Sequence, residues 1–110
     1  MSSPPLGYLD RLAAVEADMD RLVRRLRSLS ESAWRSRREP VTVLLENLAS
    51  LTGRLERIPA PVAPDLPVYA LPDAVVLLGG DVLIALSRTP DLADLDLVDR
   101  WFREAFEETG

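Results

Sequence analysis

With 110 residues, the chain is long enough for one domain with a modest hydrophobic core. Hydrophobic residues make up 47% and charged residues 28%, a composition typical of soluble globular proteins that excludes wholesale disorder. The net charge is −5, with arginines concentrated before residue 40 and acidic residues after residue 58. The two ends can therefore attract each other, within one chain or between two.

The residue types that are missing exclude several classes of site. The chain has no Cys, no His and no Lys, which removes disulfides, the commonest metal ligand and lysine nucleophiles. Acid–base chemistry would rest on a carboxyl group with a raised pKa. No nucleophile–base pair stands out, so we expect a non-enzymatic protein with no cofactor and no bound metal.

No stretch of the sequence predicts a secretory signal peptide or a membrane-spanning helix. The N-terminus has neither a basic start nor an apolar run of the signal-peptide type. The most apolar stretch, residues 74–86, is too short to span a bilayer and is interrupted by Gly79, Gly80 and Asp81. We therefore expect a cytoplasmic protein without membrane association.

The first part of the chain predicts a long amphipathic helix over about residues 7–38, because apolar residues recur there at alternating steps of three and four. The repeat stops before Pro40 and then resumes one residue out of phase. Proline is a favourable first residue of a helix. The sequence thus predicts an antiparallel helical hairpin, with a shorter second helix from Pro40 to Ile58.

The shorter second helix leaves the first half of the first helix uncovered. The apolar residues of this helix form one line along its surface, an apolar seam. Such a seam is stable only when another helix packs on it, so either the C-terminal part of the chain or a second chain must cover it. We take the second possibility, a homodimer, as the main hypothesis. The predicted oligomer interface comprises Tyr8, Leu12, Val15, Met19 and Leu22.

Residues 59–71 are rich in proline and predict an extended, semi-rigid connector. The next segment, about residues 72–86, is compatible with a buried helix that begins at Pro72 or with a β-hairpin around Gly79 and Gly80. We favour the helix, because both candidate strands would be apolar on both faces.

The last element, about Asp94 to Glu108, has the apolar spacing of an amphipathic helix. Trp101, Phe102 and Phe106 on this helix are a candidate anchor for a partner's groove. The alternative is that these aromatic residues pack on the uncovered part of the first helix.

The second hypothesis is a phosphate- or nucleic-acid-binding regulator. Arg21, Arg24, Arg25 and Arg27 gather on the first helix and are candidate contacts for an anion or a partner. A pI near 4.7 argues against nucleic acid, since nucleic-acid-binding domains are usually basic.

The third hypothesis comes from a short motif. Trp34 with Ser36 near the predicted turn, and Tyr69 with Asp73 four residues later, resemble the Trp-x-Gly turn and the Tyr-x-x-x-Asp/Glu signal of small helical-hairpin proteins exported by type VII secretion. Ser36 takes the place of the glycine in that motif. The resemblance implies a secreted protein whose export depends on Tyr69.

The sequence as a whole predicts an all-α fold of one domain, a helical bundle. Its predicted parts are a helical hairpin over residues 1–58, a connector over 59–71 and two C-terminal helices over 72–110 that pack on the hairpin. We expect an oligomerisation, adaptor or regulatory protein that acts through protein–protein interaction. The main expected partner is a second copy of the chain, and another protein is the second expected partner.

Overall fold

Helices dominate the computed structural model, which describes residues 6–59 and 65–110. In this part of the chain there are four α-helices, one short 3-10 turn and no β-strand. In chain order the elements are α1 (Tyr8–Ser28), α2 (Glu31–Glu56), η1 (Val68–Ala70), α3 (Leu71–Arg88) and α4 (Leu92–Glu108). The predicted all-α fold is confirmed.

The first helix ends at Ser28 and not near residue 38. Leu29 has an extended backbone, and the side chain of Ser30 caps α2 by accepting a hydrogen bond from the Ala33 N–H at 3.2 Å. The prediction of a long first helix and a shorter second one is therefore wrong, since α1 has 21 residues and α2 has 26.

Pro40 lies inside α2 and does not begin it. A proline within a helix removes a backbone hydrogen bond and costs about 3 kcal/mol. Tertiary packing offsets this cost, because Trp34 before the proline and Val41 after it are both buried. Trp34 and Val41 lie seven residues apart on one face of α2. The change of phase thus falls between Leu29 and Trp34, and not at Pro40.

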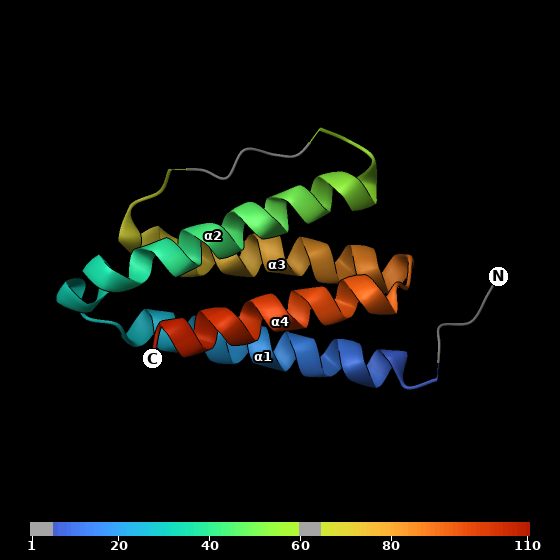
Figure 1. Cartoon of the computed structure of the whole chain (residues 1–110), viewed down its shortest axis with the longest axis horizontal. Helices are drawn as coiled ribbons and strands as arrows, with labels where there is room; N and C mark the ends of the chain where they lie inside the picture. Colours follow the sequence, from blue (N-terminus) through green and yellow to red (C-terminus); the bar gives the residue numbers. More distant parts are fainter. Residues whose placement is uncertain (1–5, 60–64) are drawn as a thin grey trace.

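α1 and α2 lie diagonally across the bundle, and so do α3 and α4. α1 packs against α3 and α4, and α2 packs against the same two helices, whereas α1 and α2 scarcely contact each other. α1 and α4 run in one direction, and α2 and α3 run in the opposite direction (Figure 1). Although α1 and α2 are antiparallel, the prediction that they pack on each other as a hairpin is wrong.

The two C-terminal helices agree with the predictions. α3 confirms the helix over residues 72–86, with Pro72 in its first turn, and Asp91 caps α4 by accepting a hydrogen bond from the Asp94 N–H at 3.0 Å. The end of α2 and the start of η1 lie at opposite ends of the bundle (Figure 1). The predicted proline-rich connector joins these two ends, and its residues 60–64 lie outside the described residues.

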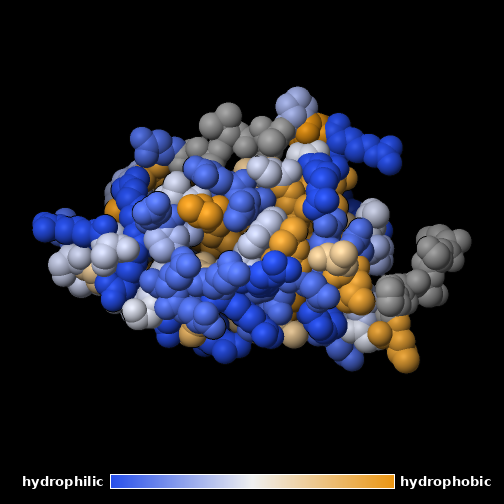
Figure 2. Space-filling view, in the orientation of Figure 1, coloured by the Kyte–Doolittle hydropathy of each residue, from blue (hydrophilic) through white to orange (hydrophobic). Residues whose placement is uncertain are grey.

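One hydrophobic core runs through the bundle, and all four helices contribute to it. Leu22 of α1, Leu48 of α2, Val82 of α3 and Phe102 of α4 are each fully buried. On the face of the molecule in Figure 2, hydrophilic side chains cover α4, whereas hydrophobic side chains show between α4 and α2. The core is closed by contacts within one chain, and this decides where the candidate sites lie.

Candidate functional site

The seam predicted as an oligomer interface lies inside the bundle. Tyr8, Val15, Met19 and Leu22 are at most 5% exposed, and Leu12 is partly buried. The seam is covered by α3 and α4 of the same chain, which is the alternative to a second copy. A dimer through these residues would require the bundle to open, so the physical reason for placing an interface here is removed.

The hydroxyl of Tyr8 links α1 to the end of α3 and to the start of α4. It donates a hydrogen bond to the Leu86 carbonyl at 2.7 Å and accepts one from the Asp91 N–H at 3.2 Å. Burial raises the pKa of Tyr8 above its usual value, and the charges of neighbouring aspartates add to the rise. This tyrosine acts as a structural link.

Three of the four arginines predicted to contact an anion have partners within the chain. Arg21 pairs with Asp18 at 2.7 Å, and Arg27 pairs with Asp73 of α3 at 3.0 Å. Arg25 is stacked on the Phe106 ring, 3.5 Å from its centroid, and donates a hydrogen bond to the carbonyl of the same residue at 2.6 Å.

Arg24, the fourth of these arginines, is exposed and forms no ion pair with any other described residue. Two arginines of α1 pair with acids of the C-terminal half of the chain, Arg27 with Asp73 and Arg11 with Asp96. This arrangement satisfies the attraction between the two ends that the charge distribution predicts.

The aromatic residues of α4 divide into two groups. Phe102 is fully buried in the core, so it cannot anchor a partner on the surface. Phe106 is partly buried beneath Arg25, and Trp101 is partly buried on the opposite side of α4, where Val43 and Glu104 line the same shallow pocket. Core packing accounts for Phe102, and intrachain contacts cover much of the other two rings.

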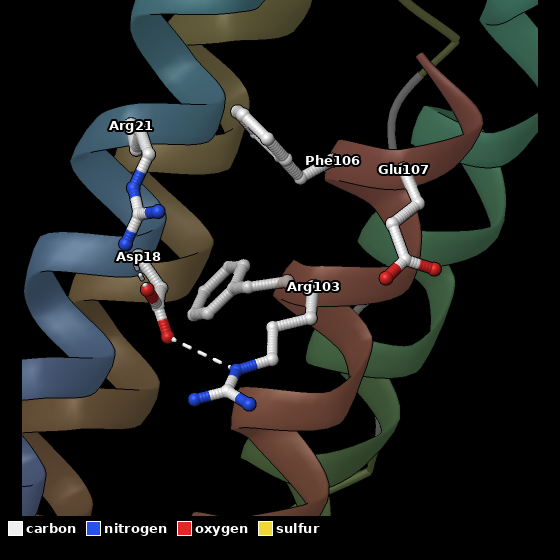
Figure 3. A pocket seen from close by; sticks show the side chains of 6 residues that line it. Asp18, Arg21, Arg103, Phe106 and Glu107 are labelled. Carbon is white, nitrogen blue, oxygen red and sulfur yellow. Dashed lines mark hydrogen bonds and ion pairs between the residues drawn. The ribbon is translucent and has the colours of Figure 1, made fainter. Parts of the chain in front are cut away.

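A cavity of about 240 Å³ opens between α1 and α4. Figure 3 shows Asp18 and Arg21 on α1 opposite Arg103 and Glu107 on α4, with the two phenylalanine rings between the helices. Asp18 accepts hydrogen bonds from both guanidinium groups, at 2.7 Å from Arg21 and at 3.5 Å from Arg103. The charges around this cavity thus largely satisfy one another.

Asp99 is the most strongly perturbed acid near this cavity. It is only 9% exposed, and its Oδ1 atom is buried without a hydrogen-bond partner among the described residues. Burial raises the pKa of Asp99 to about 6, the adjacent Asp18 carboxyl adds to the rise, and the Arg103 guanidinium 3.2 Å away opposes it.

Asp99 is a carboxyl with a raised pKa, the kind of group that acid–base chemistry in this chain would need. The sequence shows Asp99 only as one of several acids in α4, and the contact with Asp18 required the tertiary structure. No Ser, Thr, Cys or Lys lines the cavity, and the described residues contain no group of three or more His, Cys, Asp or Glu side chains that could hold a metal. The structure therefore places one carboxyl with a raised pKa at the contact between α1 and α4 and does not define a reaction.

The outer face of α3 carries an apolar surface that sequence reasoning missed. Val76, Leu77 and Ile84 are 41%, 67% and 51% exposed, and Gly80 lies among them. These four residues, hereafter the α3 stripe, recur at helical spacing on the side of α3 that faces away from the core. A row of exposed apolar side chains on one helix is a common mark of an interaction site.

The sequence did contain a signal for this surface. The stretch Val68–Arg88 is long and apolar enough to cross a membrane by length and composition alone. An 18-residue window within it has a mean hydropathy of 1.7, yet only 44% of that window is buried in the bundle. A helix that is apolar on every side cannot bury all of its sides in a bundle of four helices. The prediction that this helix is buried was right for one side only.

Two apolar hollows adjoin the start of α3. One, of about 360 Å³, lies beside the α3 stripe and is lined by Leu66, Ala70, Asp73, Ala74, Leu77 and Leu78. The other, of about 440 Å³, lies at the end of the bundle and brings together Trp34 and Tyr69, the two aromatic residues of the secretion-like motif. Clefts lined mainly by hydrophobic residues are the usual shape of binding sites.

Comparisons of the chain with protein-family models, with curated proteins and with solved structures find no match.

Proposed function

We propose that this protein is a non-enzymatic helical adaptor or regulator that acts through protein–protein interaction. The observation that supports the proposal is the α3 stripe, whose three large apolar side chains remain between 41% and 67% exposed. Burying a Leu, Val or Ile side chain contributes roughly 1.5–3 kcal/mol. A partner that covers the α3 stripe therefore gains a contact that the folded chain leaves unused.

The groove beside the α3 stripe extends this surface. Leu77 belongs to both, and the remaining lining of the groove is apolar except for Asp73. A ridge of large side chains next to a groove is the shape into which the ridge of another helix packs. The partner that fits best is thus an amphipathic helix.

The experiment compares Leu77→Glu with the matched control Val43→Glu. Both residues lie on helices, are exposed (67% and 47%) and have acidic neighbours, but Val43 lies between α2 and α4. Tagged wild type and both variants are expressed in the cells of origin, cross-linked and purified. We expect proteins cross-linked to wild type, including a second copy, to be retained by Val43→Glu and lost from Leu77→Glu.

The same cross-linked species in all three samples would refute the proposal. Circular dichroism of each variant confirms that the helix content is unchanged. A cytoplasmic location, which the sequence predicts, stays a prediction in this proposal.

The secretion hypothesis has one observation in its favour, since Trp34 and Tyr69 line the same hollow although they lie far apart in the sequence. Tyr69 is 84% exposed, so a receptor could reach its ring. This hypothesis predicts that Tyr69→Ala abolishes export of the chain into the culture medium while the protein accumulates in the cell. Equal amounts of wild type and variant in the medium would remove it.

A further inference from the structure

We propose that the α3 stripe binds a second copy of this chain, with the two α3 helices antiparallel about a twofold axis. This inference rests on the proposed function and names the partner. It is carried by three features of α3: an unexplained glycine, an apolar pair and a charge at each end.

Gly80 has no explanation within the chain. A Cβ atom at Gly79 would lie 2.6 Å from the Met19 sulfur and 3.1 Å from the Phe102 ring, so core packing requires a glycine there. A Cβ atom at Gly80 would meet nothing within 4 Å. Glycine in a helix costs about 1 kcal/mol relative to alanine. A residue that costs stability without serving the core is explained when another helix approaches the backbone closely at that point.

The α3 stripe is complementary to itself in the antiparallel direction. In a pairing centred between Gly80 and Asp81, Leu77 of each copy faces the partner's Ile84, so the two most exposed apolar side chains of the stripe cover each other. Each Asp81 faces the partner's Gly80 and lies near the partner's Asp81 across the twofold axis; Asp81 is exposed, so this like-charge pair stays at the solvated edge of the contact. An isologous contact of this kind closes after two copies.

The charges at the two ends of α3 select the antiparallel direction. Asp73 in the first turn and Arg88 in the last turn are both exposed; Asp73 already pairs with Arg27 of its own chain, but its side chain is 79% exposed and leaves room for a second partner. In the antiparallel pairing Asp73 of each copy meets the partner's Arg88, which makes two attractive contacts. In a parallel pairing in register, Asp73 would face Asp73 and Arg88 would face Arg88, and both contacts would be repulsive.

The length of the surface predicts a weak dimer. From Asp73 to Arg88 the stripe and its flanking charges extend about 22 Å at 1.5 Å per residue. One pair of helices lies at the low end of stable interface sizes. We therefore expect association at roughly micromolar to submillimolar concentrations.

The first experiment is sedimentation equilibrium of the purified full chain over about 5–500 µM. We expect the mass of wild type to rise from monomer to dimer with concentration. Leu77→Glu should weaken association at least roughly tenfold, because a charge replaces a buried apolar contact on each side of the twofold axis. Val43→Glu should associate as wild type does.

The second experiment tests the antiparallel register by exchanging charges. Asp73→Arg alone places arginine against the partner's arginine, and Arg88→Glu alone places glutamate against the partner's aspartate. Each variant should associate more weakly than wild type. An equimolar mixture should associate more tightly than either variant, because both end contacts become attractive in the mixed dimer. Circular dichroism confirms that both variants keep the helix content of wild type.

Three results would overturn the proposed dimer. They are a wild type that is monomeric at every concentration, a mixture of Asp73→Arg and Arg88→Glu that associates no better than either variant alone, and a dimer that Leu77→Glu leaves intact. A monomer that binds phosphatidylcholine vesicles through Leu77 also overturns it and assigns the stripe to lipid. If the purified chain is a monomer and cross-linking in cells still depends on Leu77, the dimer fails while the proposed function stands. If neither depends on Leu77, both fail.

Discussion

The two adjacent glycines of α3 offer a sharp test of the packing described above. Gly79→Ala and Gly80→Ala make the same chemical change on one helix, and both gain about 1 kcal/mol of helix propensity. Gly79 faces the core, where the added methyl would lie 2.6 Å from the Met19 sulfur, a distance at which atoms must move.

Relief of that clash is restricted on both sides. Met19 is 5% exposed and Phe102 is fully buried, so both side chains must repack within the bundle to make room for the methyl group. Overpacking a core by one methyl group costs about 1–3 kcal/mol. The net effect of Gly79→Ala is therefore a loss of up to about 2 kcal/mol, whereas Gly80→Ala gains about 1 kcal/mol because a Cβ there meets nothing within 4 Å.

The free energy of unfolding is measured by urea titration with far-ultraviolet circular dichroism, at a protein concentration where the chain is monomeric. We expect Gly80→Ala to be more stable than wild type and Gly79→Ala to be less stable, with a difference of about 1–3 kcal/mol between them. Equal stability of the two variants would refute the close contact between α3, Met19 and Phe102.

The remaining predictions concern a buried acid and a buried hydroxyl. Because the pKa of Asp99 is raised from 3.8 to about 6, the folded state holds this proton more tightly, and the associated stability is present below pH 3.8 and lost as the pH rises through 6. The Asp99→Asn side chain carries no charge at any pH. The free energy of unfolding of this variant should match that of wild type near pH 4 and exceed it by as much as roughly 3 kcal/mol at pH 7.5. If urea titrations gave the same difference at both pH values, this reasoning would be wrong. Tyr8→Phe leaves the Leu86 carbonyl without its 2.7 Å donor and should cost about 1–2 kcal/mol in the same assay, whereas Tyr69→Phe, at an 84% exposed position, should cost nothing measurable. Equal effects of the two tyrosine substitutions would show that the buried hydroxyl is not a structural link.

The periodicity of apolar residues was sufficient to predict the class of the fold and two of its helices. α3 and α4 were predicted because Pro72 and the acids near residue 91 mark helix starts, and the apolar positions between them follow helical spacing. The boundary between α1 and α2 was misplaced, because Leu29 continues the spacing across the break while Pro40 imitates a helix start. The local signals that mark the true boundary are the cap at Ser30 and the spacing of Trp34 to Val41.

The candidate sites were less predictable than the helices. The sequence brought Trp101, Phe102 and Phe106 to attention, but a list of apolar residues does not say that Phe102 lies in the core while Leu77 lies on the surface. Likewise, nothing local connects Asp18 with Asp99, which meet only because α1 and α4 pack side by side.

By itself, the sequence determined that this protein is built from amphipathic helices with one strongly apolar helix, because spacing and capping are local properties of the chain. Only the tertiary structure decided which helix covers which. An apolar face on a helix shows that another helix must pack on it, but it does not show which one. Four helices can cover their apolar faces in several arrangements. Here α3 and α4 cover the seam of α1, which removes the predicted interface from the surface and leaves the outer side of α3 exposed in its place.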